Sequence, residues 1–401
     1  MNGLSLRLAF AQGASGLVSG VATPWFGAWL AWRGLSPAQI GTLLAAGMLL
    51  RVPIVPFTGL VADARNDRRG MMLAIFLVML LGFGGLNLAT LPVFLFLCAI
   101  PANLSAGAAN PLLESVCVRL ATRFGFDYGH VRLWASSAYV FSNILSGLLV
   151  SRFGLVVIAP WLVGAAIVNI VAVYALPAPP VDHPKLPLGP RMRAMWAEAR
   201  ELLRSPVFLL FLAAASLDQG SHAFYYAYGT LHWRQLGYPG WLIGLLWPLG
   251  VFAEIGFMSI SLKLFRRIGA VWLLVAGGAS CVVRWTILAF DPPLPLVVFA
   301  QILHGGSFAL AHLGAMYFVL QAVPPRLAAT AQSLYAVSNA GIVMGIATYA
   351  SGPLYAAAGG RAYLLMSAMG FGAIVFALAL GRAWSGARIL EDRFDEELAM
   401  I

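Results

Sequence analysis

Long apolar stretches separated by short polar or basic segments recur along the chain. Six precede a polar segment at 177–206 and six follow it. Each has about the 20 residues that a helix needs to cross a membrane. The stretches lie at 8–31, 38–60, 71–90, 93–117, 130–150, 155–176, 207–230, 239–262, 270–289, 295–320, 328–351 and 361–382. This pattern predicts an all-α membrane protein of twelve transmembrane helices.

The polar segment predicts how these helices are divided. We expect an N-terminal six-helix bundle over 1–176, a linker over 177–206, and a C-terminal six-helix bundle with a short tail over 207–401. Nineteen of the 25 basic residues fall on the linker side of the spans and four fall on the other side. Because cytoplasmic loops are enriched in Lys and Arg, we expect the linker and both termini to be cytoplasmic in an inner membrane. The first apolar stretch lacks a small-residue cleavage site and is interpreted as a span.

Composition supports a membrane protein and excludes several functions. The chain is 61% hydrophobic and 10% charged, whereas a soluble domain has about 25% charged residues. The net charge of +10 is spread over short loops, so we expect no nucleic-acid partner. Neither a phosphate-binding loop nor an enzyme motif is present, and the three cysteines have no metal-ligand spacing. Secondary transport by a monomer without a cofactor remains, with a small solute, protons and the lipid bilayer as partners.

A short basic pattern occurs at equivalent places in the two halves. Gly59 to Asp63 is followed by Arg68 and Arg69, and a basic turn from Lys263 to Arg267 follows the eighth stretch. This similarity predicts two pseudo-symmetric bundles with a binding site between them near the midplane. Asp63, Arg68 and Arg69 either set orientation alone or grip neighbouring helix ends as a charge relay.

Ionisable residues inside the predicted spans are the main candidates for function. A charge in the hydrocarbon layer costs several kcal/mol unless it is paired or hydrated, with about 3 kcal/mol as the lower figure. An unpaired carboxyl there tends to hold a proton. The candidates are Arg51, Glu114, Asp218, Glu254 and Arg284, together with His222, His304 and His312.

The fourth stretch carries a polar face. Asn103, Gly107, Asn110 and Glu114 are spaced 4, 3 and 4 residues apart, which places them on one side of a helix. The face either packs against another helix or lines a cavity, and we favour the cavity because Glu114 cannot face lipid. Arg132 near the start of the next span is either a cytoplasmic arginine or the partner of Glu114.

The seventh stretch combines ionisable and aromatic groups. Asp218, His222 and Tyr225 occur at i, i+4 and i+7, which predicts one helix face. Tyr226 follows directly, and Trp247 lies in the next span. Their rings could stack on a flat substrate, although tyrosine also collects at membrane interfaces.

Three later spans and the second span hold the remaining charges. His304 and His312 lie ~12 Å apart along a helix and ~80° apart around it, so both can face inward. Arg284 needs a buried acid or an anionic ligand, and Glu254 in the preceding span is the nearest acid in topology. Arg51 either pairs with an acid of its own half or takes part in function.

Several segments carry a resemblance to a known family. The chain resembles the major facilitator superfamily, and within it the phenylpropionate permease group, which is similar to the lactose permease type of proton symporter. The segments are Asp127 to Ser136, Gln219 to Tyr226, Leu246 to Glu254, Val283 to Trp285, and Gln301 to His304 continuing to His312.

The resemblance implies roles for particular residues. Arg132 matches a substrate-binding arginine, and Glu114 matches its acidic partner. Arg284 and His304, which are 20 residues apart, match proton-pathway residues. Ser307 stands where lactose permease has its proton-carrying glutamate, so any proton has to be carried by Glu254, Asp218 or a histidine.

These observations predict a proton symporter for uptake of a small organic solute by alternating access. We expect an aromatic carboxylate such as a phenylpropionate, with Arg132 or Arg284 meeting its carboxyl group. The binding group comprises Glu114, Arg132, Asn110, Asp218, His222, Tyr225, Tyr226 and Trp247, and the proton-coupling group comprises Glu254, Arg284, His304 and His312. A sugar or nucleoside symporter, a drug–proton antiporter and a receptor without transport activity are the alternatives.

Overall fold

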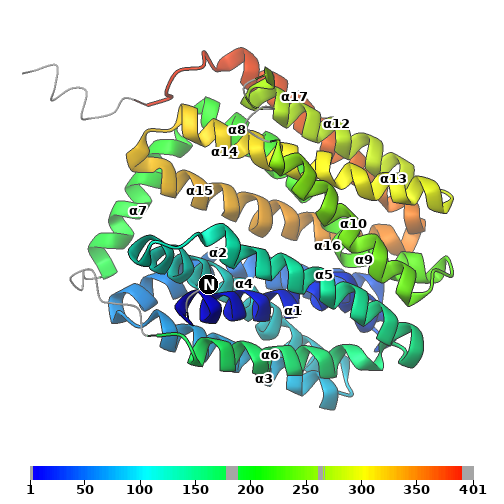
Figure 1. Ribbon diagram of the computed structural model, residues 1–401. Coiled ribbons are helices and arrows are strands. Elements are labelled where there is room, and N and C mark those ends of the chain that lie inside the picture. The colour runs from blue at the N-terminus through cyan, green and yellow to red at the C-terminus, as the bar shows by residue number, and fades with distance from the viewer. Residues whose placement is uncertain (1–2, 178–187, 261–264, 266, 391–401) are drawn as a thin grey trace, which may run out of the picture. The chain divides into compact units, whose positions relative to one another are not determined.

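The computed structural model describes residues 3–177, 188–260, 265 and 267–390, and these residues form helices joined by short turns (Figure 1). The helices of the first part are α1 Gly3–Trp32, α2 Pro37–Arg65, α3 Arg68–Leu88, α4 Pro92–Phe124, α5 Tyr128–Phe153, η1 Leu155–Val157, α6 Ile158–Tyr174 and α7 Leu188–Leu203. Those of the second part are α8 Pro206–Gly220, α9 Ala223–Gln235, α10 Gly240–Ser259, α12 Ala270–Leu288, α13 Leu294–His304, η2 Gly305–Leu310, α14 Ala311–Ala322, η3 Pro325–Leu327, α15 Ala328–Ala336, η4 Val337–Val343, α16 Met344–Ala358, η5 Gly359–Ala362 and α17 Tyr363–Ala383.

The helical runs have the length and hydropathy of membrane spans. Within the described residues, 10 runs meet both criteria, and the run Pro325–Ala383 has 59 residues. That run contains two lengths of helix, α15 to α16 and α17, and α1 adds a further 30-residue helix. The described chain therefore has twelve helical segments long enough to span a membrane, which confirms the all-α expectation.

Two helices extend beyond the apolar stretches that predict them. α2 continues to Arg65, so Gly59 to Asp63 is helical and the turn follows at Asn66, whose φ is 51°. α4 continues to Phe124 and ends at Gly125, whose φ of 67° suits glycine. The apolar stretch ends at residue 60, five residues before the helix does, because polar residues can follow an apolar stretch without breaking the backbone hydrogen bonding of a helix.

The predicted linker contains the helix α7. Glu201 of this helix accepts two hydrogen bonds from Arg326, at 2.5 and 3.0 Å. A two-bond arrangement between guanidinium and carboxylate has well-defined geometry, so it ties α7 to η3, directly before α15. Positions 178–187, the predicted basic residues Lys263 and Arg266, and the tail from 391 onward lie outside the described residues.

Contacts group the chain into two units. The first unit is Met1–Leu188, Tyr225–Pro248 and Thr348–Ala357, and the second is Gly189–Phe224, Leu249–Ala347 and Ala358–Ile401. This grouping describes packing, and the predicted bundle boundaries at 176 and 206 stay predictions. In the first unit α1 packs on α4, α5 and α6, and α4 packs on α2 and α3. In the second unit α12 packs on α13, α14 and α17, and α8 packs on α17.

Close helix contacts in the first unit depend on glycine. A Cβ at Gly16 of α1 would lie 2.3 Å from the Ala135 carbonyl oxygen of α5. A Cβ at Gly147 of α5 would lie 2.8 Å from Gly244 Cα of α10. Helices in membranes gain stability from such tight packing, because lipid removes the hydrophobic drive between them.

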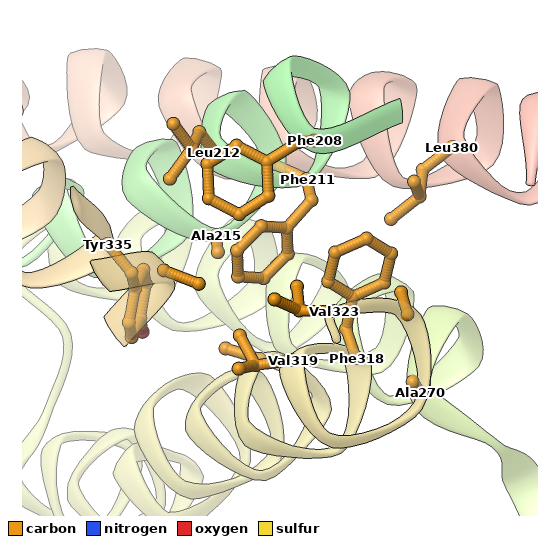
Figure 2. Packing of buried hydrophobic residues seen from close by; sticks show 14 of the residues in the cluster. Phe208, Phe211, Leu212, Ala215, Ala270, Phe318, Val319, Val323, Tyr335 and Leu380 are labelled. Carbon is orange, nitrogen blue, oxygen red and sulfur yellow. The ribbon is translucent and has the colours of Figure 1, made fainter. Parts of the chain in front are cut away.

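An apolar cluster fixes the beginning of α8 in the second unit. Figure 2 shows Phe208 and Phe211 of α8 beside Phe318 of α14. The Phe211 and Phe318 rings stack with centroids 4.3 Å apart and an interplanar angle of 18°. This packing holds the first turns of α8 and thereby positions the polar residues that follow toward its C-terminal end.

Candidate functional site

The polar face of α4 in the first unit holds an ion pair with α5. Arg132 Nη1 lies 3.2 Å from Glu114 Oε1, and the two side chains are 53% and 32% exposed. The Tyr128 hydroxyl donates a hydrogen bond to the other oxygen of Glu114. Asn110 accepts a 2.7 Å hydrogen bond from Ser15 of α1. The structure therefore contains the predicted Glu114–Arg132 pair, within reach of solvent.

Asp127 fixes the start of α5, one turn before Arg132. Its carboxylate accepts from the Gly129 N–H at 2.7 Å and lies 2.7 Å from His130 Nδ1. The backbone N–H of Gly129, together with the His130 side chain, lowers the pKa of Asp127. A negative charge at this position also favours the N-terminal end of the helix.

Asp63, Arg68 and Arg69 bind neighbouring helix ends. Arg68 donates to Asp63 at 2.6 Å and also to the Ser115 hydroxyl of α4. Arg69 donates to the Tyr174 carbonyl oxygen at the end of α6, at 2.5 Å. The contacts match the predicted grip on neighbouring helices, and any part in gating stays a prediction.

Arg51 of α2 lies against the same face of α4 as Glu114. Its Nη2 donates to the Asn103 carbonyl oxygen at 2.9 Å. One interpretation of the sequence was that Arg51 pairs with an acidic residue of its own half. Within the described residues its hydrogen-bond partner is instead this backbone carbonyl.

The second unit buries a network around Arg284 of α12, whose side chain is 0% exposed. Its Nη1 donates to His304 Nδ1 at 2.8 Å and to Ser307 Oγ at 3.3 Å. Its Nη2 donates to Gln301 Oε1 at 3.3 Å. Because Arg only donates, His304 Nδ1 has to accept, which places the proton of a neutral His304 on Nε2.

Ser307 connects this network to His222. His222 Nδ1 lies 3.2 Å from the Gln219 carbonyl oxygen, and Nε2 lies 3.2 Å from Ser307 Oγ. Since a carbonyl only accepts, Nδ1 carries the proton in neutral His222 and Nε2 accepts from the Ser307 hydroxyl. The Ser307 hydroxyl has a second acceptor, the His304 carbonyl oxygen at 3.4 Å. Ser307 can therefore turn its hydroxyl proton from His222 Nε2 to the His304 backbone carbonyl oxygen.

A π-helical segment places Ser307 in the network. The segment η2 begins at Gly305, directly after His304, and contains Ser307 and Phe308. A Cβ at Gly306 would lie 2.5 Å from Ser280 Oγ, so glycine lets η2 approach α12. Short π-helical segments occur frequently at functional sites.

Asp218 lies near the C-terminal end of α8 and is 1% exposed. Neither of its carboxyl oxygens has a hydrogen-bond partner within the described residues. A Cβ at Gly277 of α12 would lie 2.9 Å from Asp218 Oδ2, so the carboxyl packs against α12 at a position where glycine has no side chain.

The seventh span, predicted to be one continuous helix with a single polar and aromatic face, consists of two helices. α8 ends at Gly220, a turn covers Ser221 and His222, and α9 begins at Ala223. Asp218 and His222 belong to the second unit, whereas Tyr225 and Tyr226 belong to the first. The expectation of one continuous face was wrong, because a helix-spacing argument assumes an unbroken helix.

The predicted aromatic residues pack on one another in the first unit. Trp247 stacks on Tyr225, with ring centroids 4.3 Å apart, and lies 6.1 Å from Tyr226. The Trp247 Nε1 donates to the Thr230 hydroxyl at 3.0 Å. Tyr225 and Trp247 are only 2% and 4% exposed, so these two rings are already covered in this state.

Glu254 and His312 belong to helices that pack beside the network. A Cβ at Gly250, one turn before Glu254 on α10, would lie 2.9 Å from His304 Cδ2. The His312 ring stacks on Phe308 with centroids 6.3 Å apart, and the Phe308 and His304 centroids lie 5.3 Å apart. These two members of the predicted proton-coupling group therefore lie on helices that contact the Arg284 network.

Comparison with known proteins agrees with these features. A family model described as the MFS_1 like family matches residues 15–366. The chain belongs to this family. It is a multi-pass membrane transporter and not an enzyme.

Relatives of this MFS_1 like transporter come from bacteria. It is 31% identical over 357 residues to a probable 3-phenylpropionic acid transporter of Escherichia coli, covering 87% of this chain and 90% of that protein. It is 27% identical over 322 residues to a maltose permease of Geobacillus stearothermophilus, covering 80% of this chain and 79% of that one. A crystal structure of a mutant of the nucleoside transporter NupG matches with a TM-score of 0.82 at 16% identity, covering 95% and 100% of the two chains. That match shows the fold.

Some contacts of this MFS_1 like transporter were not predicted from sequence. Tyr128 and Gln301 lie inside the segments that carry the family resemblance. Each is a polar side chain close in sequence to a predicted charged or histidine residue, and this proximity could have marked both as hydrogen-bond partners. Ser15 gave no such signal, because a lone serine in an apolar helix is common. Ser307 was noted as a missing glutamate, whereas its bridging position depends on the π-helical segment.

Proposed function

We propose that this transporter takes up a small aromatic carboxylate together with protons, by alternating access. The similarity to a probable 3-phenylpropionic acid transporter supports the substrate class. The similarity to a maltose permease keeps a sugar symporter as the second candidate. The basic residues of the short loops favour cytoplasmic termini in the bacterial inner membrane, and we take a monomer as the working unit.

The buried connection from Arg284 through Ser307 to His222 carries the proposal of proton coupling. When His222 gains a proton, its Nε2 becomes a donor and can no longer accept from Ser307. The Ser307 hydroxyl then turns to its second acceptor, the His304 carbonyl oxygen at 3.4 Å. Protonation of His222 thus changes the hydrogen bonding of Ser307, whose hydroxyl oxygen also accepts from Arg284.

The Glu114–Arg132 pair is the proposed substrate contact of the first unit. Its 53% exposed arginine is reachable by an anionic solute. Asn110 lies one turn from Glu114 on the same face of α4 and adds a polar group. Tyr225, Tyr226 and Trp247 supply aromatic surface once the aromatic cluster opens.

Asp218 and Glu254 are the two carboxyls available to carry the proton. A buried charge without a partner is costly, so the isolated carboxyl of Asp218 holds a proton in this state. A carrier also has to release that proton to water in another state. Asp218 therefore fits the role that Ser307 cannot fill, and Glu254 is the alternative.

The proposal is tested by uptake of labelled 3-phenylpropionate into energised vesicles, with and without a protonophore. We expect Asp218→Asn to retain exchange of the acid across the membrane and to lose uphill accumulation. Glu254→Gln is measured in parallel, and loss of accumulation in that variant alone would assign the carrier to Glu254. Asp127→Asn, which makes the same chemical change on an exposed residue, serves as the control. Uptake that is unaffected by the protonophore would contradict proton coupling.

A further inference from the structure

The position of Arg51 places a positive charge in the middle of α2, where the side chain is partly buried. Arg51 is the fifteenth of the 29 residues of α2, so ~20 Å of helix separates it from either end at ~1.5 Å per residue. An arginine near the middle of a span cannot easily extend its head group to the membrane surface. The charge therefore has to be balanced within the protein or by a ligand.

The guanidinium lies against Gly107 of α4. A Cβ at Gly107 would lie 2.3 Å from Arg51 Nε and 2.6 Å from Arg51 Cζ, so the glycine provides the space that the guanidinium occupies. Among the described residues, the Arg51 side chain makes one hydrogen bond, from Nη2 to the Asn103 carbonyl oxygen. Within the same residues, its Nε is buried without a hydrogen-bond partner. Arginine has five N–H donors, so most of this donor capacity is unused.

The acid on the same face of α4 is already engaged. Glu114 lies seven residues beyond Gly107, which corresponds to ~10 Å along the helix. Its carboxylate binds Arg132 and the Tyr128 hydroxyl. Within the described residues of the first unit, Arg51 thus has a carbonyl dipole for a partner and no carboxylate.

We propose that Arg51 is the residue that binds the carboxylate of the transported solute, with Gly107 as its positioning residue. The inference rests on the proposed function and refines it. Arg132 has to break its pair with Glu114 before it can bind another carboxylate, whereas Arg51 gains a first counter-charge. A planar guanidinium with free donors also suits bidentate binding of a carboxylate.

The test compares an acid with its uncharged amide. Calorimetry measures binding of 3-phenylpropionate and 3-phenylpropionamide to the purified full-length protein at neutral pH. For Arg51→Gln we expect binding of the acid to weaken by about ten- to a hundredfold, the range for loss of a charge-assisted hydrogen bond. Binding of the amide stays within about twofold, so the preference for the acid disappears.

A glycine pair separates binding from folding. Gly107→Ala places a methyl group where Arg51 lies, and we expect the same loss of preference for the acid. Gly84→Ala in α3 is the matched control, because no atom lies within 4 Å of the added Cβ. It is expected to bind both compounds as the native chain does. If Arg51→Gln does not fold, Arg51→Lys and Gly107→Ala still report on the preference for the acid.

The outcomes distinguish this inference from the proposed function. A native chain that prefers the acid, with the preference retained in Arg51→Gln, Arg51→Lys and Gly107→Ala, overturns the inference and leaves the proposed substrate class intact. Equal weakening of acid and amide shows that Arg51 only holds α2 on α4, and also overturns it. A native chain without preference for the acid overturns the proposed substrate class and the inference together.

Discussion

The two units hold their ionisable residues in contrasting surroundings. In the first unit, Arg132 is 53% exposed and pairs with an opposite charge, Glu114. In the second unit, Arg284 is 0% exposed and donates to His304, Ser307 and Gln301. An accessible pair can be reached by a polar group of a solute without unfolding of the surrounding helices. A buried network instead requires every donor and acceptor to be matched, so it responds to a single proton.

The contrast predicts different responses to substitution. An exposed ion pair contributes about 0–1 kcal/mol to stability. A buried group deprived of its partner costs about 1–3 kcal/mol, and more when it is charged. Changes to the exposed Glu114–Arg132 pair should therefore affect transport without unfolding, whereas changes to the buried Arg284 network should affect both.

The largest expected effect is that of His304→Leu. Loss of the acceptor 2.8 Å from Arg284 Nη1 leaves a buried cation short of a hydrogen bond. We expect the free energy of unfolding to fall by about 2–3 kcal/mol and uphill accumulation to be lost. Thermal unfolding of the purified protein and vesicle uptake measure the two effects. His304→Asn restores an acceptor near the Nδ1 position and should recover stability without recovering accumulation. Full stability in His304→Leu would show that the network does not constrain the second unit.

An intermediate effect, confined to transport, is expected for Arg132→Ala. Its pair with Glu114 is too exposed to change the free energy of unfolding by more than about 1 kcal/mol. Uptake of labelled 3-phenylpropionate should nevertheless be abolished, because the Glu114–Arg132 pair is a proposed substrate contact of the first unit beside Arg51. Arg132→Lys keeps the charge and is expected to retain part of the uptake. Unimpaired uptake in Arg132→Ala would remove this residue from the site and leave Arg51 as the arginine of the first unit.

The smallest effect is expected for Asp127→Asn at the start of α5. The pKa of Asp127 is lowered in the folded chain by the Gly129 N–H and by His130, so its charge stabilises the fold above the unfolded pKa of about 4. This contribution is lost as the pH falls through the lowered pKa. The variant should melt slightly below the native chain at neutral pH, and the difference should vanish under strongly acidic conditions. A difference independent of pH would attribute the effect to the shape of the side chain.

Periodicity and hydropathy were enough to predict the all-α architecture and the residues placed inside spans. The Glu114–Arg132 pair was one of two interpretations left open, and the structure contains it because both helices continue up to a short connection at Gly125 and Asp127. The prediction that Asp218 and Tyr225 share one helix face was wrong, because α8 and α9 are separate helices. No apolar pattern distinguishes an unbroken span from two shorter helices in line.

The sequence by itself determined which ionisable groups lie in the membrane, since depth along a helix follows from counting residues between polar ends. It also determined the sign of each charge and hence which of them require partners. The identity of those partners is set by the tertiary structure alone. The rotation of α2 places Arg51 against Gly107. The π-helical segment places Ser307 between Arg284 and His222. Contacts between helices depend on rotation and register, and a sequence rich in interchangeable apolar residues encodes these only through the packing of the whole unit.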